Sequence, residues 1–223
     1  MDLVRSYEFF QPEKLTERVH IIGCGAVGST LAEMLTRFGI TKITLWDFDK
    51  VEPHNIANQL FFSDQIGKPK VEAVAEILER INPQIKNDLV LESNGWSKNS
   101  PKLNGYVFLA VDNIDLRREI CESIKYNRQV KGVFDFRMGL TDGQHYAADW
   151  SSLQNAKRLI ETMQFHQDEV KEVRSACNSV LSVCPSIRST VAAGVANFIN
   201  FAKGGPLKNM VLLDAFDFAV DAI

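Results

Sequence analysis

The sequence predicts an α/β fold built on a doubly wound, mostly parallel sheet with an antiparallel extension. Short β-rich runs alternate with amphipathic helical segments along the chain, an order typical of parallel sheets with helices on both faces. One run, residues 106–112 (YVFLAVD), is apolar almost throughout, as expected for a strand that is covered on both sides.

Each predicted element has a local signal. Residues 18–22 and 42–47 are short, β-rich and bounded by glycine or charged residues, which indicates strands. Apolar residues recur at helical spacing over 27–38 and 70–81, and these segments end at Gly39 and at Asn82-Pro83. Further along we expect a helix over 116–128, a strand over 130–136, the antiparallel extension over 140–149, a helix over 191–201 and a last strand over 211–214.

Composition bounds the class of protein. A chain of 223 residues with 45% hydrophobic content can bury one sizeable core. The net charge of −3 and the absence of basic runs argue against a nucleic-acid partner. No apolar stretch approaches the roughly 18 residues of a membrane span, and the start of the chain does not resemble a secretory signal. We therefore expect a cytoplasmic protein without a membrane partner.

A glycine-rich turn marks the first candidate site. Residues 23–28 (GCGAVG) match G-x-G-x-x-G between a predicted strand and a predicted helix, as in Rossmann-like nucleotide-binding folds. Gly23 permits the tight turn, Gly25 lets the backbone approach phosphate, and Gly28 lets helix pack on strand. Ala26 begins the helix, whose free N–H groups attract an anion. Asp47, about 20 residues further on, can accept hydrogen bonds from ribose hydroxyls.

The residues after Asp47 resemble those of one known family. Residues 47–59 (DFDKVEPHNIANQ) and 67–70 (GKPK) are similar to the pattern D-x-D-x-V-x-x-x-N-x-x-R-Q, then G-x-x-K, of the ThiF/MoeB/HesA family, which is related to ubiquitin-activating enzymes. The resemblance continues at 81–83, at 111–113 with Arg117, and at 211–215. It implies one nucleotide-binding adenylation domain over 1–223, with an N-terminal arm over 1–17 and an irregular crossover over 151–184.

The resemblance also implies an activity. This activity is adenylation of a carboxyl group with ATP and Mg²⁺, with release of pyrophosphate. The resemblance implies that the carboxyl group is the C-terminal glycine of a ubiquitin-like or sulfur-carrier protein, or a peptide C-terminus. Both reactants are anionic, so cations must offset their repulsion. Lys70 is the candidate phosphate clamp and Asp112 the candidate Mg²⁺ ligand.

The same resemblance assigns further nucleotide contacts. It places Asp47 at the ribose and Asn55 on the phosphate side, while Asp49 is either a second metal contact or a loop cap. Asn58, Gln59 and Asn113 complete the implied set.

One position departs from the family pattern. Asn58 stands where the family has arginine, and asparagine carries no charge to set against pyrophosphate. Arg5 is one candidate to supply that charge, in trans, because relatives form homodimers whose N-terminal segment reaches the partner's site. The other candidates are Arg117, Arg137 and Lys68. Two alternatives stay open: a catalytically weak or inactive member that binds nucleotide or a partner chain, and an NAD(P)-dependent oxidoreductase.

The cysteines and histidines show no metal-binding spacing. None of the four cysteines forms a C-x-x-C pair, so we expect no zinc site. Relatives carry a crossover-loop cysteine at a place similar to Cys177, and some use it to take over the acyl group. Cys177 is therefore either a nucleophile toward an acyl-adenylate or a small apolar filler. His20 lies in a predicted strand, which favours a core role.

Overall fold

The computed structural model describes residues 1–169, 173 and 181–223, and its centre is an eight-stranded sheet. The strands lie in the order β3-β2-β1-β4-β5-β6-β7-β8. Their bounds are β1 Val19–Ile22, β2 Ile43–Trp46, β3 Val90–Glu92, β4 Gly105–Leu109, β5 Val130–Met138, β6 Asp142–Asp149, β7 Met210–Asp214 and β8 Ala219–Ala222.

The direction of the strands confirms the predicted fold class. Strands β3, β2, β1, β4 and β5 run parallel, and β6, β7 and β8 add to β5 as an antiparallel extension. Strands β3 and β8 were not predicted. The first is only three residues long and the second is exposed throughout, so neither shows the apolar run or alternation that marks a strand.

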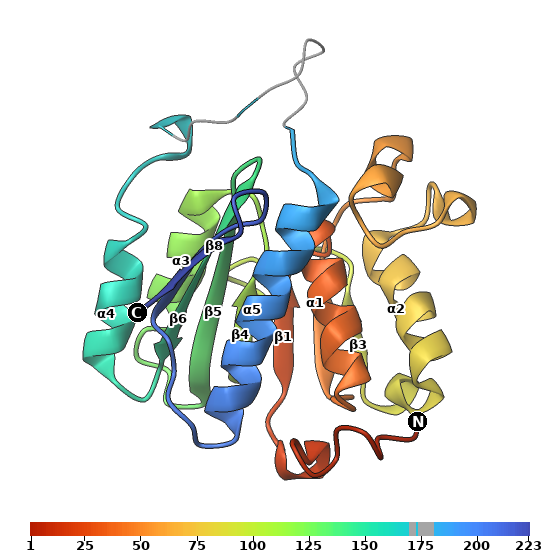
Figure 1. Cartoon of the computed structure of the whole chain (residues 1–223), viewed down its shortest axis with the longest axis horizontal. Helices are drawn as coiled ribbons and strands as arrows, with labels where there is room; N and C mark the ends of the chain where they lie inside the picture. Colours follow the sequence, from red (N-terminus) through yellow and green to blue (C-terminus); the bar gives the residue numbers. More distant parts are fainter. Residues whose placement is uncertain (170–172, 174–180) are drawn as a thin grey trace.

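In the described part of the chain, five α-helices lie against the two faces of the sheet (Figure 1). They are α1 Ala26–Arg37, α2 Lys70–Ile81, α3 Ile114–Ile124, α4 Leu153–Glu161 and α5 Cys184–Ala202. Helix α5 begins well before the predicted 191–201, because Pro185 is favourable in a first helical turn and polar residues there hide the apolar stripe. Helix α3 begins two residues earlier than predicted because Asn113 caps its start. It ends at Ile124, before the predicted residue 128.

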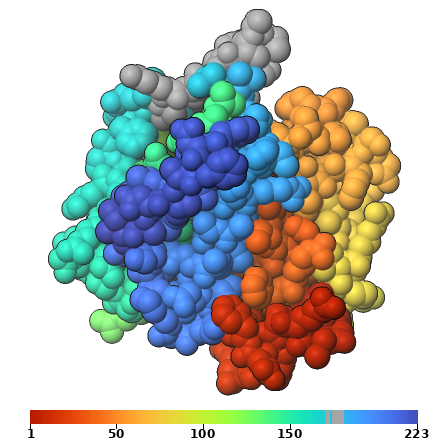
Figure 2. Space-filling view, viewed as in Figure 1, coloured from red at the N-terminus to blue at the C-terminus, as the bar shows by residue number. Residues whose placement is uncertain are grey.

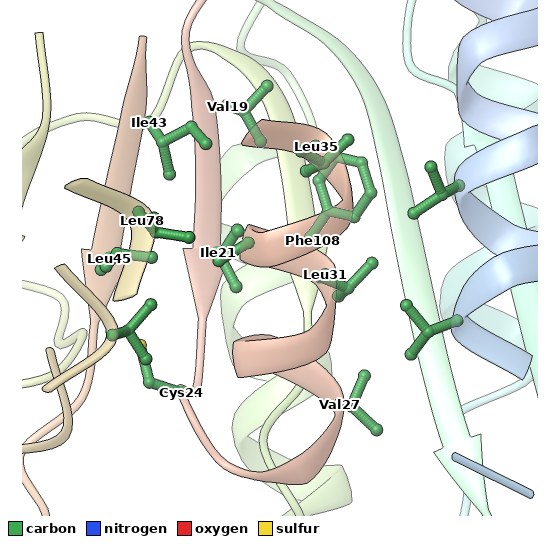
Figure 3. Close-up of a cluster of buried hydrophobic side chains, with 14 of the residues drawn as sticks. Val19, Ile21, Cys24, Val27, Leu31, Leu35, Ile43, Leu45, Leu78 and Phe108 are labelled. Carbon is green, nitrogen blue, oxygen red and sulfur yellow. The ribbon is translucent and has the colours of Figure 1, made fainter. Parts of the chain in front are cut away.

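Two hydrophobic cores lie on opposite sides of the sheet, which explains the uninterrupted apolar runs. Neighbouring strand residues point to opposite faces, so Ile21 and Phe108 join the core lined by α1, α2 and α5. Figure 3 shows Leu31 and Leu35 of α1 packed into this core. Ile22 joins the other core, which α3 and α4 line. No helix in the described part of the chain is both long and apolar enough to cross a bilayer.

Two buried histidines give the fold an expected dependence on pH. His20, confirmed as a core residue, is 4% exposed, and His145 is fully buried between Phe134 and Phe136 with its Nε2 3.1 Å from Asn197 Nδ2. Burial lowers the pKa of each imidazole to about 4, from 6.5. Between these values the unfolded chain binds protons that the folded chain does not, so the free energy of unfolding falls as pH decreases through this window.

We therefore expect the wild-type protein to lose stability as the pH falls from about 6.5 to about 4 in urea denaturation. Each histidine should contribute a loss of up to about 1.4 kcal/mol for every pH unit below the pKa of the unfolded chain. His145→Phe should weaken this pH dependence, whatever its effect on stability at neutral pH. Equal pH dependence in the variant and the wild type would contradict the assignment to His145.

Candidate functional site

The glycine-rich turn lies where the order of the strands reverses. β1 has β2 on one side and β4 on the other, so the crevice between the carboxyl ends of β1 and β4 is the place where such sheets bind ligands. Gly23 follows β1 directly and has a φ of 96°. A Cβ there would lie 2.7 Å from the carbonyl oxygen of Ala110, just past β4, so only glycine fits.

The other two glycines have different roles: Gly28 serves helix packing, and Gly25 leaves space for a ligand. A Cβ on Gly28 would lie 1.8 Å from the carbonyl oxygen of Gly23, so this glycine lets α1 pack against its own turn. A Cβ on Gly25 would meet no atom within 4 Å. Gly25 is also the N-cap of α1 and provides no side-chain cap. The space above it is open, and uncapped N–H groups of α1 suit an anion such as phosphate.

Asp47 ties the glycine turn to the loop that follows β2. Its Oδ2 accepts from the backbone N–H of Cys24 at 2.6 Å, and its Oδ1 accepts from that of Asp49 at 2.8 Å. Burial raises the pKa of this carboxyl, and the two amide hydrogen bonds partly offset the increase. A carboxylate has about four acceptor positions, so Asp47 can still accept from hydroxyls of a bound ribose.

Lys70 lies beside the same turn at the start of α2. Its Nζ is 2.8 Å from Asp49 Oδ2, and its side chain is only 10% exposed whereas that of Asp49 is 50% exposed. A buried cation at the positive end of a helix dipole is unfavourable by itself. An anion beside Lys70 stabilises this arrangement. Here the anion is the carboxylate of Asp49, and a phosphate group could take its place.

The loop after Asp49 contacts α1 and the segment just before α5, and it carries three further candidate residues. Asn55 is buried, and its Oδ1 accepts from the N–H of Glu52 at 2.9 Å within a short 3₁₀-helix, Pro53–Ala57. Asn58 Nδ2 donates to Ser182 Oγ, just before α5. Gln59 Oε1 is buried and has no partner among the described residues. A buried acceptor without a partner suits a ligand donor or an ordered water.

Asp112 and Asn113 follow β4 but differ in role. Asn113 Oδ1 accepts from the N–H of Leu116 at 2.9 Å and so caps α3. Asp112 is exposed, and within the described part of the chain its carboxylate makes no hydrogen bond or ion pair. No group of three or more His, Cys, Asp or Glu among the described residues could hold a metal ion. One carboxylate plus phosphate oxygens is nevertheless a set that suits Mg²⁺.

The cations suggested as substitutes for the family arginine have other partners. Arg117 donates to Asp135 and to the carbonyl oxygen of Val111, which immediately precedes Asp112. Arg137 Nε donates to the other oxygen of Asp135 at 2.7 Å. Lys68 Nζ lies 2.6 Å from Glu76 Oε1. These three cations are therefore already paired with carboxylates, and the sequence showed their charge but not these partners.

Arg5 lies at the opposite edge of the sheet from the glycine turn. Its arm packs on the far end of α1, where Leu3 occupies the space next to Gly39. Figure 2 shows this arm in red at the lower end of the molecule. Arg5 therefore lies far from the glycine turn of its own chain and cannot serve that site. Its predicted role in the site of a second copy stays a prediction.

The three cysteines among the described residues differ in burial. Cys24 and Cys121 are buried, and burial raises the pKa of each thiol, which keeps it in the unreactive protonated form. Cys184 is half-buried at the first residue of α5, and its Sγ accepts from Arg188 Nε at 3.1 Å. Cys177 lies outside the described residues, so its role stays a prediction.

A depression of about 550 Å³ lies at the amino edge of the sheet, away from the glycine turn. It is lined by residues of the segment that leads into β4 and of the end of α3, among them Trp96, Lys98 and Lys102. None of the predicted site residues lines it. The open backbone at Gly25, beside Lys70 and Asp47, is therefore the stronger candidate site on chemical grounds.

Comparison with known proteins points to one family. A model of the ThiF family matches residues 8–220. The ubiquitin-like modifier-activating enzyme 5 of Aedes aegypti is 38% identical over 151 residues, which is 60% of this chain and 37% of that protein. The same enzyme of Drosophila mojavensis is 46% identical over 98 residues, 44% of this chain and 22% of that protein. The chain thus spans well under half the length of the curated relatives it matches.

Solved structures share the fold. The crystal structure of E. coli MccB with ATP matches 95% of this chain and 65% of its own with a TM-score of 0.71 at 18% identity. The crystal structure of PaaA matches 100% of this chain and 68% of its own with a TM-score of 0.68 at 20% identity. At these identities the likeness is one of fold.

Proposed function

The chain belongs to the ThiF family, and on that premise we propose that it adenylates a carboxyl group with Mg·ATP and releases pyrophosphate. One observation carries the proposal. An open glycine turn lies at the strand-order reversal, with a buried lysine beside it whose only carboxylate partner among the described residues is half-exposed. This arrangement can exchange its own ion pair for a phosphate without rebuilding the surrounding core.

Each residue of the site has a proposed role. Lys70 leaves Asp49 to bind phosphate, Asp47 orients the ribose, and the α1 N-terminus at Gly25 and Ala26 binds phosphate oxygens through backbone N–H groups. Asn55 lies on the phosphate side, with Gln59 as a further contact. Asp112 would hold Mg²⁺ together with phosphate oxygens, and the ion would supply charge neutralisation for the departing pyrophosphate.

The carboxyl substrate is proposed to be the C-terminal glycine of a ubiquitin-like or sulfur-carrier protein. The names of the matched relatives, ubiquitin-like modifier-activating enzymes, support this class. A peptide C-terminus is the variant that the fold relative MccB suggests, because its structures include complexes with its peptide MccA.

Two further proposals concern the assembly and the acyl acceptor. We propose a homodimer in which Arg5 reaches the partner's site, and a monomer at micromolar concentration in sedimentation would argue against it. We also propose Cys177 as an acyl acceptor after adenylation. Full acyl transfer by Cys177→Ala would exclude that role.

A second candidate function is a binding module that holds nucleotide without catalysis. The hydrogen bond from Asn58 to Ser182 favours it, because the side chain at the family's arginine position is uncharged and already engaged within the protein. Exchange of labelled pyrophosphate into ATP distinguishes the two. Adenylation predicts exchange that requires a free Gly-Gly carboxylate and stops when that carboxylate is amidated. ATP binding without exchange for any carboxylate would favour the binding module.

A further inference from the structure

The carboxyl edge of the sheet has more negative than positive charge available for a triphosphate. Asp47, Asp49 and Asp112 lie there, and Lys70 is the buried cation among them. Three of the other candidate cations are paired with carboxylates, as described above. A polyphosphate with several negative charges therefore needs a further cation that is not already neutralised.

Arg188 of α5 has the required properties. It is exposed, and no carboxylate among the described residues pairs with it. Its Nε donates to Cys184 Sγ, one helical turn earlier, at 3.1 Å. Sulfur is a weak acceptor, so exchange of this contact for a phosphate oxygen costs little. A guanidinium also presents a fork of donors that matches two phosphate oxygens at once.

Arg188 lies in the second turn of α5, near the end of the helix that shares the carboxyl edge of the sheet with the start of α1. Val191 and Val195 follow at helical spacings of three and seven, so the three residues share one stripe of the helix, and both valines belong to the core that α1 lines. α1 and α5 lie side by side, and both begin at the carboxyl edge of the sheet (Figure 1).

One hydrogen bond connects the nucleotide loop with the segment just before α5, and another connects the same loop with α1. Asn58 Nδ2 donates to Ser182 Oγ, two residues before α5 begins. The N–H of Leu60 donates to Ser29 Oγ in the first turns of α1, at 3.3 Å. The loop that carries Asn58 is therefore held between the first turns of α1 and α5, and Arg188 lies on the α5 side of it.

We propose that Arg188 binds the β- and γ-phosphates of ATP and supplies the positive charge that Asn58 does not. This inference rests on the proposed function, and it names the phosphate tail as the part of the substrate that Arg188 recognises. AMP lacks that tail, so a residue that recognises it affects ATP and not AMP.

Calorimetric titration of Arg188→Ala with Mg·ATP and with AMP tests this directly. Loss of a charged hydrogen bond should weaken ATP binding about tenfold and leave AMP binding unchanged. Arg188→Lys should recover part of the loss. Arg80→Ala removes an exposed arginine from the far end of α2 and should change neither affinity. Unchanged ATP affinity in Arg188→Ala, or equal weakening of ATP and AMP, would overturn the proposal.

A second variant pair uses rescue. Asn58→Arg in the Arg188→Ala background should restore most of the ATP affinity, because it places a guanidinium on the loop beside the segment that leads into α5. Failure of this rescue, with both variants folded, would overturn the shared role of the two positions. ATP binding that responds to Arg188 while wild-type protein shows no pyrophosphate exchange would refute adenylation alone. Exchange by wild-type protein with no effect of Arg188 would refute this inference alone, and no ATP binding by wild type would refute both.

Discussion

Lys70→Ala is expected to lower pyrophosphate exchange by about 100- to 1,000-fold, the scale observed when one electrostatic contact to the transition state is removed. Lys70 is the buried cation beside the glycine turn, and it lies at the start of a helix that offers no side-chain cap. The reaction creates a pyrophosphate leaving group at that place, so the loss should affect kcat more than the KM for the carboxyl substrate.

Lys68→Ala is the matched control for Lys70→Ala. It lies two residues earlier, is 40% exposed and pairs with Glu76, so its removal should change exchange less than about threefold. The folded state should survive Lys70→Ala, because the carboxylate it leaves behind on Asp49 is half-exposed and can be hydrated. Exchange by a folded Lys70→Ala at more than half the wild-type rate would contradict the assigned role.

The largest expected effect on stability is that of Asp135→Ala. Asp135 is fully buried between Arg117 and Arg137, whose side chains are 7% and 15% exposed. Removal of one partner leaves buried charge without compensation, which typically costs about 3–5 kcal/mol. Arg137 also donates to Thr162 at the end of α4, and Arg117 donates to the carbonyl of Val111. The variant should therefore loosen the contact between β5 and the end of α4 and the contact between α3 and the residue before Asp112.

Asp115→Ala is the comparison for Asp135→Ala. Asp115 also pairs with an arginine, Arg118, but its side chain is 41% exposed, so its loss should destabilise the protein much less than the loss of Asp135. Urea denaturation of both variants gives the two free energies of unfolding. Equal destabilisation by the two variants would show that the buried network does not contribute as described.

The parts of the fold and site that could be predicted from sequence are those with local signals. The glycine turn was recognisable because Gly23, Gly25 and Gly28 occur at fixed spacing between a strand and a helix. Lys70 was recognisable because residues 67–70 resemble the family's G-x-x-K pattern, and its position at the start of α2 is consistent with that pattern. The apolar run of β4 indicated a strand that is covered on both faces, and the structure confirms this.

The parts that could not be predicted depend on contacts between distant residues. The sequence shows the charge of Arg117 and Arg137 but not that Asp135 lies between them. The early start of α5 was hidden because its first turn is polar, and Arg188 was missed with it. The Oδ1 of Asn113 caps α3, which a capping pattern in the sequence could have indicated, and its contact with the nucleotide stays a prediction.

The most direct test of the central claim is a calorimetric titration of wild-type protein and Gly25→Val with Mg·ATP and with NAD⁺. Gly25 is the position where a side chain meets no protein atom but would occupy the space proposed for phosphate. The account predicts that wild type binds Mg·ATP and not NAD⁺, and that Gly25→Val folds normally but loses ATP binding. Binding of NAD⁺ alone, or full ATP affinity in folded Gly25→Val, would contradict it.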